Sequence, residues 1–362
     1  MLEGSAAARR IFVAAALAVG GCSGSDPGET EGASTGATTT ATTDEDATAG
    51  PSTTTGASTS SATTVTTVTS DTSSASDPGT GEYTTSGPAT TEAGTTGGVD
   101  VARECDAWPE HPEWIFCDDF ESDAPLVGPG RYFEGDMPRI EGAGLAGSAA
   151  LEAAWSQGQV GAGGVKLAFG EVPDSYFDNG VRPGEHFDEL YYRMLVKHEA
   201  GWEGAPAKLS RATVFVDGAW SQAMIAHVWS HNTEPYLGMD PVRCVESGAV
   251  VCSGYNDFNN MSWLGFQLGD TPIFTPALSD QWVCVEVRVR LNDPGVANGV
   301  QTVWIDGALE VSSESLDFMG TYEGFGLNAV FFENYWNDGA LKDQRRWFDN
   351  IIVSEAPIGC PG

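Results

Sequence analysis

Strict alternation of apolar and polar residues over Trp282–Leu291 is the strongest structural constraint in this sequence. Apolar side chains occupy every second position, namely Val283, Val285, Val287, Val289 and Leu291. A period of two is typical of a β-strand with one buried face, whereas an α-helix requires a period near 3.6. A loop rich in Asn, Asp, Gly and Pro separates this segment from Val300–Ile305. The two segments therefore predict a β-hairpin.

The same patterning recurs through the second part of the chain. It predicts strands at Leu190–His198, Ala212–Val216, Gln222–Trp229, Asn328–Trp336 and Trp347–Ser354. No run of ten or more residues keeps a helical period together with capping residues. Many strands without intervening helices predict an all-β domain, a sandwich or jelly roll of two antiparallel sheets.

The first 100 residues form a different kind of polymer. No Lys or Arg occurs between Arg10 and Arg103, and all 11 Trp lie beyond position 100. From residue 23 to residue 100 the chain consists mainly of Ser, Thr, Ala and Gly, which cannot bury enough apolar surface to offset the entropy of ordering. We expect residues 23–100 to be a disordered linker with an r.m.s. span of about 50 Å. Residues 101–362 are expected to form one domain.

The extreme N-terminus has the layout of a secretory signal. Arg9 and Arg10 precede the apolar run Ile11–Val19, which ends in two glycines and Cys22. The run is too short to span a bilayer. A Cys in this position resembles the lipobox of bacterial lipoproteins. The resemblance implies that residues 1–22 are a signal peptide, that Cys22 carries the lipid, and that the exported protein is anchored to the cell envelope, at the outer membrane or cell surface. An ordinary signal peptide with a chance Cys is the alternative.

The charge balance restricts the partners of the chain. With 51 acidic and 17 basic residues the net charge is −34, which excludes nucleic acid as the default partner because phosphate binding needs clustered Lys and Arg. Residues 101–362 hold 39 of the acids and 15 of the bases. Four of these bases lie between Arg193 and Arg211. An acidic polymer could bind only at a local basic groove, which these four bases could form.

Six cysteines follow the linker, at positions 105, 117, 244, 252, 284 and 360. An even number in an exported protein predicts disulfides, although six cysteines allow 15 pairings. We expect the two pairs that are close in sequence, Cys105–Cys117 and Cys244–Cys252, which leaves Cys284 with Cys360. Zinc is disfavoured because no C-x-x-C spacing occurs.

Four motifs follow one another in a particular order: an acidic opening strand at Phe116–Ser122, the strand from Trp282, the turn Trp304–Gly307 and the closing strand Trp347–Ser354. In this order they resemble the concanavalin A-like jelly rolls of carbohydrate-binding domains, family 16 glycosidases and several polysaccharide lyases. The resemblance covers most of residues 115–356 and implies a polysaccharide partner. The E-x-D-x-x-E motif of those glycosidases is absent. Hydrolysis would therefore need a non-standard pair of carboxylates.

A lyase needs other groups. β-Elimination on a uronate requires a group that neutralises the carboxylate, a base for the C5 proton and a proton donor for the leaving oxygen. Segments 208–211, 225–231 and 333–337 supply such residue types, in an outline similar to jelly-roll alginate and glucuronan lyases. The resemblance implies that Arg211 and Asn334 neutralise the substrate carboxylate. It makes His227 the base or a further neutralising group, and Tyr335 the base or the acid. Lys208 would assist. Further substrate contacts are expected at Arg193, Trp229, His231, Tyr236 and Trp336.

Structural alternatives accompany these assignments. A strand His with apolar neighbours is commonly a hydrogen-bonded structural residue, and strand aromatics are commonly core residues. The leading hypothesis is a lyase of an acidic polysaccharide. A non-catalytic glycan-binding or adhesion module, stacking sugars on Trp229, Tyr236 and Trp336, is the second hypothesis.

A calcium site is also expected by resemblance. In such sandwiches the acidic opening strand and the closing strand lie together, and carboxylate oxygens are the ligands that Ca²⁺ prefers. The candidate ligands are Asp119, Glu121 and Asp349. The alternative is that these acids cap strands, and no organic cofactor is expected.

Overall fold

The computed structural model describes residues 101–230 and 234–361. The predicted signal peptide, lipid attachment at Cys22, linker and substrate contact at His231 lie outside these residues. The described part contains 18 β-strands and two 3-10 segments, η1 (Val101–Glu110) and η2 (Leu145–Gly147). In this part of the chain no helix has the length and apolar character needed to cross a membrane.

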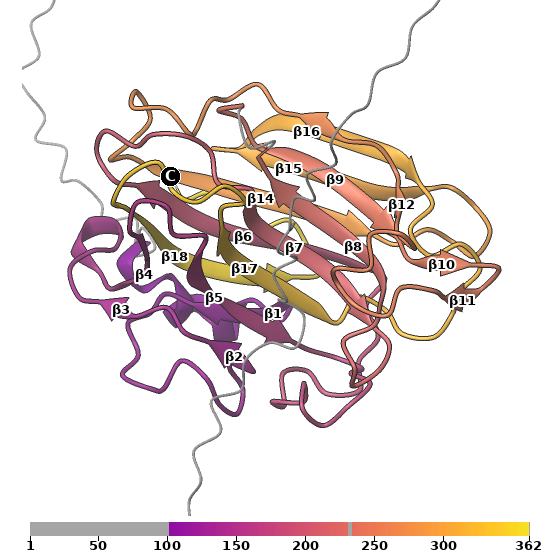
Figure 1. Ribbon diagram of the computed structural model, residues 1–362. Coiled ribbons are helices and arrows are strands. Elements are labelled where there is room, and N and C mark those ends of the chain that lie inside the picture. Colours follow the sequence, from indigo (N-terminus) through magenta and orange to yellow (C-terminus); the bar gives the residue numbers. More distant parts are fainter. Residues whose placement is uncertain (1–100, 231–233, 362) are drawn as a thin grey trace, which may run out of the picture. The chain divides into compact units, whose positions relative to one another are not determined.

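The first of the two large sheets, called sheet I, contains eight strands and is antiparallel throughout. Its order is β16-β15-β14-β6-β18-β4-β3, and β1 also pairs with β18 (Figure 1). Its strands are β1 (Trp114–Asp118), β3 (Arg139–Ile140), β4 (Ala150–Trp155), β6 (Glu189–His198), β14 (Trp282–Arg290), β15 (Gly299–Ile305), β16 (Ala308–Leu316) and β18 (Gln344–Ser354).

The second large sheet, called sheet II, is also antiparallel and has the order β12-β9-β8-β7-β17-β5-β2, with β13 paired to β9. Its strands are β2 (Glu134–Gly135), β5 (Gly161–Ala168), β7 (Lys208–Phe215), β8 (Gln222–Trp229), β9 (Gly238–Arg243), β12 (Ser262–Trp263), β13 (Gln267–Leu268) and β17 (Ala329–Tyr335). A small hairpin of β10 (Val245–Glu246) and β11 (Ala249–Val250) extends beyond it.

The predicted all-β fold of two antiparallel sheets is confirmed. Strands β6, β8, β14, β15, β17 and β18 coincide with predicted segments to within three residues at either end. The predicted hairpin pairs Val285 with Ile305 and Arg290 with Val300. Strand β7 begins four residues earlier than predicted, at Lys208. This earlier start places Lys208 and Arg211 inside the sheet.

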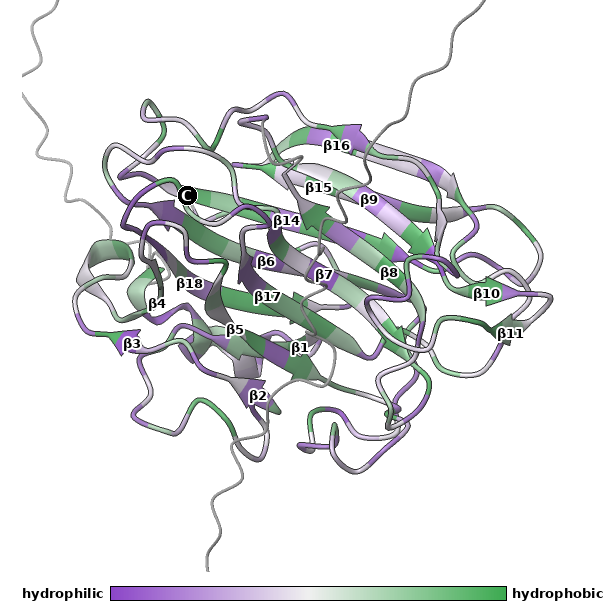
Figure 2. Ribbon diagram, in the orientation of Figure 1, coloured by the Kyte–Doolittle hydropathy of each residue, from purple (hydrophilic) through white to green (hydrophobic). Residues whose placement is uncertain are grey.

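The core lies between the two sheets. Apolar side chains at alternate positions of β14 in sheet I face those of β7 and β8 in sheet II, and all belong to one buried cluster. Examples are Val285, Val287, Ala212, Val214 and Ala226. Figure 2 shows hydrophobic and hydrophilic residues alternating along the central strands. The alternation read from the sequence thus separates an inner from an outer face on each sheet.

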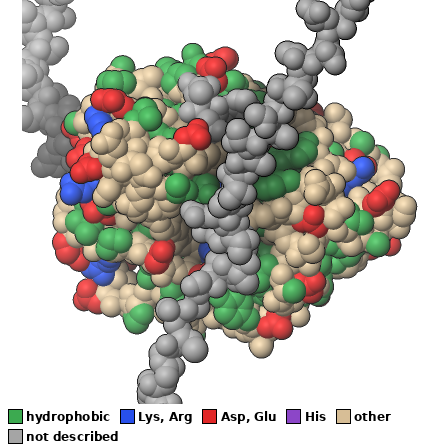
Figure 3. Space-filling model, in the orientation of Figure 1, with side chains coloured by type: hydrophobic (Ala, Val, Ile, Leu, Met, Phe, Trp, Pro, Cys, Tyr) green, Lys and Arg blue, Asp and Glu red, His purple; other side chains and the backbone are tan. Residues whose placement is uncertain are grey.

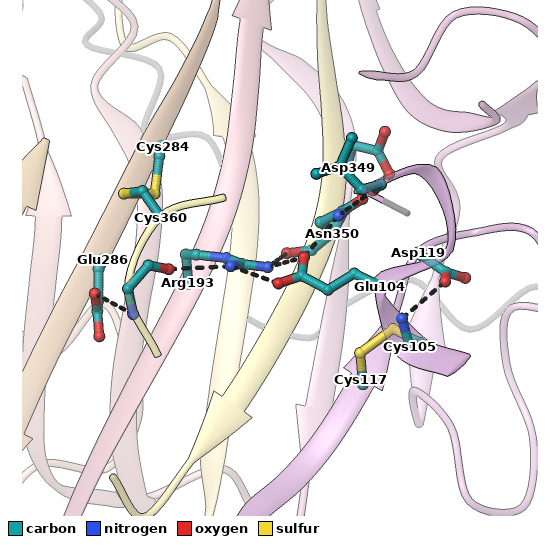
Figure 4. Close-up of polar contacts among 12 residues, drawn as sticks. Glu104, Cys105, Cys117, Asp119, Arg193, Cys284, Glu286, Asp349, Asn350 and Cys360 are labelled. Carbon is teal, nitrogen blue, oxygen red and sulfur yellow. Dashed lines mark hydrogen bonds and ion pairs between the residues drawn. A yellow bond between two sulfur atoms is a disulfide. The ribbon is translucent and has the colours of Figure 1, made fainter. Parts of the chain in front are cut away.

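Both ends of the described chain are tied to the outer face of sheet I. Arg193 Nη1 donates to Glu104 Oε1 of η1 at 2.9 Å and to the carbonyl of Gly359 at 3.0 Å (Figure 4). Glu286 accepts hydrogen bonds from the backbone N–H groups of Ile358 and Gly359. The three predicted disulfides are confirmed, and Cys105–Cys117 and Cys284–Cys360 secure these two terminal segments.

Candidate active site on the outer face of sheet II

Strand register assembles the candidate site. Val330, Ala212 and Ala226 are paired across β17, β7 and β8 and face the core. The next row of paired residues therefore points to the outer face of sheet II. That row contains Phe331, Arg211, His227 and Asp240, and a second row pairs Tyr335, Lys208 and Trp229. Four of the five predicted catalytic residues thus share one face.

A β-bulge in β7 makes this arrangement possible. Lys208 and Arg211 are three positions apart, and in a regular strand they would point to opposite faces. The pairing of β7 with β8 shifts between Lys208 and Ser210, so that one extra residue is inserted. Ser210 consequently lies on the inner side, where its hydroxyl is 3.2 Å from that of Tyr192. Both cations are thereby directed to the outer face.

Tyr255 lies between the two cations. The guanidinium carbon of Arg211 is 3.8 Å from the centre of the Tyr255 ring, and Lys208 Nζ is 4.4 Å from the same centre. Lys208 Nζ is also 4.4 Å from the centre of the Tyr335 ring. These contacts are cation–π interactions. Two phenol-bearing rings therefore flank one ammonium group.

The segment that carries Tyr255 is held by the predicted disulfide Cys244–Cys252. Both cysteines are buried in a small cluster with Ile225 and Val242 on the outer side of sheet II, and Tyr255 packs against this cluster. Sequence reasoning missed Tyr255 because it lies in no patterned strand. Its position three residues after a disulfide cysteine was the only available signal.

Arg211 is almost fully buried and only partly neutralised. Its Nη2 atom is 3.4 Å from Glu333 Oε1, a carboxylate to which sequence reasoning gave no role. Its Nε and Nη1 atoms are buried and have no hydrogen-bond partner. A buried guanidinium with unused donors is suited to bind a carboxylate.

The hydrogen bonding of His227 fixes its tautomer. Nδ1 lies 2.9 Å from the carbonyl oxygen of Asp240, which can only accept, so Nδ1 carries the proton. Nε2 is then an unprotonated acceptor, and it is buried without a partner. Burial lowers the pKa of His227 to about 3; the Asp240 bond opposes this shift, and the charges of Arg211 and Lys208 add to it. At neutral pH His227 is therefore uncharged.

Aromatic rings continue the site toward the edge formed by β9, β12 and β13. His227 stacks on Trp229 with ring centres 4.3 Å apart and planes 4° from parallel. Trp263 is nearly parallel to Trp229 at 6.1 Å, and 43% of its surface is exposed. Sequence reasoning did not single out Trp263. The site thus has a cationic part on β7 and an aromatic part on β8 and β12.

A buried arginine supports the site from inside the sandwich. Arg346 of β18 donates from Nη2 to the carbonyls of Lys208 at 3.2 Å and Glu333 at 2.9 Å. Its Nε atom donates to Asn334 Oδ1 at 2.9 Å. Burial lowers the pKa of Arg346 to about 9, so it remains a cation at neutral pH. Sequence reasoning missed this residue.

Several predicted site residues lie elsewhere. Asn334 faces the core, where it binds Arg346 and Gly163, so its predicted contact with the substrate carboxylate is wrong. Trp336 is buried, with Trp155 and Trp202 at 6.0 and 5.8 Å, and is a core residue. Arg193 is on sheet I, buried and bonded to Glu104. Tyr236 is half-buried in the segment before β9.

The predicted calcium ligands also accept hydrogen bonds from the protein, and the calcium site stays a prediction. β1 and β18 are paired as expected, but protein donors already use the carboxylates. Asp119 accepts from the backbone of Cys105, Glu121 from that of Ala149, and Asp349 from Leu145, Ser148 and Asn350. Burial raises the pKa of Asp349 to about 7. Within residues 101–230 and 234–361 no three His, Cys, Asp or Glu residues are grouped as metal ligands.

The fold and the site together define a two-sheet β-sandwich with a cationic and aromatic site on one outer face. No protein-family model matches the sequence, and no curated protein matches it. Similar solved structures include alginate lyase of Chlorella virus, at 12% identity and a TM-score of 0.42, covering 62% of this chain and 89% of that chain. Endo-β-1,4-glucuronan lyase of the fungus Trichoderma reesei is 14% identical with a TM-score of 0.41, and the match covers 68% of this chain and 93% of the lyase. Alginate lyase of Aplysia kurodai is 13% identical with a TM-score of 0.39, and the match covers 67% of this chain and 99% of the lyase. At such TM-scores these similarities carry no functional argument, which rests on the site itself.

Proposed function

We propose that this protein is a polysaccharide lyase that cleaves a uronate-containing glycan by β-elimination. One observation carries the proposal: Lys208, Arg211, His227 and Tyr335, from three neighbouring strands, share one outer face with Tyr255. Taken alone, each of these residues could have a purely structural role. A buried arginine with unused donors, which shares the ring of Tyr255 with an ammonium group, is a costly arrangement for stability alone, and such costs are typical of functional sites.

In the proposed reaction Arg211 and Lys208 bind the carboxylate of the uronate. Loss of the C5 proton moves electron density onto that carboxylate, and the two cations stabilise this charge. The C5–H bond and the C4–O4 bond break, a double bond forms between C4 and C5, and O4 receives a proton. Tyr335 and Tyr255 are the proposed proton-transfer groups because their rings flank Lys208.

His227 has a different role in this proposal. Its Nε2 atom offers a lone pair and no proton, so it cannot neutralise a carboxylate by donation. A pKa of about 3 also makes it a weak base for a carbon-bound proton. We propose that Nε2 accepts a hydrogen bond from a substrate hydroxyl.

The test is incubation of the exported protein with a panel of uronate glycans, followed by ultraviolet absorbance of the unsaturated product. Absorbance should rise with at least one glycan and fail to rise with Arg211→Met. Arg345→Met is the matched control, because Arg345 is an exposed arginine on sheet I. The proposal is wrong if no glycan yields unsaturated product.

A non-catalytic glycan-binding module is the second candidate. The parallel rings of Trp229 and Trp263 favour it, because Trp263 is 43% exposed and an exposed aromatic face can bind sugars without any chemistry. Glycan binding by calorimetry without unsaturated product would favour this candidate over the lyase.

The proposed setting is the cell envelope, with export directed by residues 1–22 and a lipid on Cys22. The order of a charged segment, a short apolar run, two glycines and a cysteine supports it. Cys22→Ser should move the protein from the membrane fraction to the soluble fraction. An unchanged membrane fraction would contradict the lipid anchor.

A further inference from the structure

Cations are scarce on sheet II, and most of them are already paired. Its strands carry four, namely Lys166, Lys208, Arg211 and Arg243. Lys166 binds Glu134 at 2.7 Å, and Arg243 forms an ion pair with Asp317. Among the cations of these strands, Lys208 lies against two aromatic rings without an ion pair, and Arg211, which pairs with Glu333, keeps two buried donors unused.

The outer-face row that runs from Trp229 toward the sheet edge is apolar, while Asp240 lies in the neighbouring row beside His227. Trp229 is paired with Gly238, and Gly238 is paired with Leu268, so that this row of the outer face continues without a charged side chain. Exposed apolar residues lie along this flank, namely Trp263 at 43% and Leu268 at 37%. An aromatic flank packs against the apolar C–H face of a sugar ring and offers nothing to a carboxylate.

The domain as a whole repels polyanions. Residues 101–362 carry 39 acidic and 15 basic residues, a net charge of −24. Figure 3 shows acidic side chains spread over one face of the molecule, with Lys and Arg few and mainly at an edge of the view. The five strands from β9 to β5 span about 20 Å, which accommodates several sugar rings. A polyuronate would therefore place several carboxylates on a face that can receive one.

From this distribution of charge we infer the substrate class: a heteroglycan in which each uronate is flanked by neutral sugars, and not a homopolymer of uronate. This inference rests on the proposed lyase function. The uronate carboxylate binds at Arg211 and Lys208, and the neighbouring neutral ring packs on Trp229 and Trp263. One carboxylate per two sugars matches a site with one anion-binding centre beside an aromatic one.

The test compares initial rates on two groups of glycans in buffer of ~0.15 M ionic strength, where repulsion between surface charges is partly screened. The first group holds alternating copolymers of glucuronate with a neutral sugar, such as hyaluronan and heparosan. The second holds polymannuronate, polyguluronate, polyglucuronate and polygalacturonate. We expect rates at least about tenfold higher for one or more members of the first group, in line with electrostatic effects on encounter. Equal or faster cleavage of a homopolymer overturns the inference and leaves the lyase function intact. Absence of product from every glycan overturns the lyase function, and with it this inference.

A charge-adding variant tests the same inference from the other side. Leu268→Lys places a cation on the exposed apolar flank and should raise kcat/KM for a homopolymer that the wild type cleaves slowly, by several-fold. Val127→Lys is the matched control: Val127 is 41% exposed and bridges Tyr132, close in sequence to β2 at the opposite end of sheet II. If both variants change homopolymer cleavage equally, overall charge and not the flank sets the preference, and the assignment of the aromatic flank is wrong.

Discussion

Arg346 Nη2 donates to the backbone carbonyl of Lys208 at 3.2 Å across the core, so a buried cation of sheet I holds the strand end that carries the cation of the site. The same guanidinium binds the carbonyl of Glu333 at 2.9 Å. Strands β7 and β17 both depart from regular register at this end. Arg346 therefore joins two irregular strand ends from which Lys208 and Tyr335 project.

The first prediction concerns this support. Arg346→Met alone should lower the free energy of unfolding by about 3 kcal/mol, because it leaves Asn334 and two carbonyls without their donor. Combining it with Asn334→Leu removes the unpaired Oδ1 but leaves both carbonyls, and also Gly163, without a donor, so it should restore only part of that loss. The double variant should nevertheless cleave glycan at least ~10-fold more slowly, since Lys208 and Tyr335 lose their placement. Denaturant unfolding and kcat/KM check both parts. A stable double variant with wild-type kcat/KM would show that Arg346 serves stability only.

A second prediction follows from the buried, neutral His227. Its pKa is about 3 in the folded protein against an ordinary value of 6.5. Between these values the unfolded chain binds a proton that the folded protein does not, so the free energy of unfolding falls as pH decreases from about 6.5 toward 3. This contribution is fully present above pH 6.5. His227→Asn keeps a donor toward Asp240 and cannot titrate.

Urea unfolding at pH 7.5 and 4.5 measures this effect. The wild type should lose roughly 3 kcal/mol more than His227→Asn over this interval. Burial also lowers the pKa of His198, but His198 is present in both proteins and its contribution cancels. Equal losses would mean that His227 is solvated and titrates normally.

Tyr335→Phe is the third prediction. The ring that contacts Lys208 is kept, while the phenolic group is removed. Binding of an oligosaccharide should be unchanged and kcat should fall at least ~100-fold, as expected when a proton-transfer group is lost. Single-turnover rates and calorimetric affinities separate these effects. An unchanged kcat would transfer the role to Tyr255, for which Tyr255→Phe is the parallel test.

The fold was predictable because burial on one face imposes a period of two. The alternation in β14 identified its inner face, its hairpin with β15 and thereby the class of fold. The disulfides were predictable because cysteines that are close in sequence usually pair where disulfides form, and the N-terminal sequence had led us to expect export. Both inferences rest on local sequence, where physical constraints act directly.

The site was only partly predictable, and the reason differs from residue to residue. Asn334 and Tyr335 are adjacent in one strand, so the period of two already opposed placing both on one face. Lys208 and Arg211 share a face only through a bulge, which no pattern in the sequence reveals. Tyr255 and Trp263 reach the site from a loop and a two-residue strand, and Arg346 reaches it through the core. The positions of these three residues depend on tertiary packing, which local sequence patterns do not encode.

The last prediction separates stability from function by comparing two disulfides. Cys284–Cys360 closes a separation of 76 residues on the side of sheet I, whereas Cys244–Cys252 closes one of 8 residues and holds the segment of Tyr255. Loop entropy predicts losses of about 4.5 kcal/mol for removing the first and about 2.5 kcal/mol for the second. The order should reverse for catalysis: Cys244→Ala/Cys252→Ala should lower kcat/KM at least ~10-fold by freeing Tyr255. Cys284→Ala/Cys360→Ala, measured well below its Tm, should keep it, because that bridge contacts no residue of the site. If activity follows stability in both variants, the Cys244–Cys252 bridge does not position Tyr255 for the reaction.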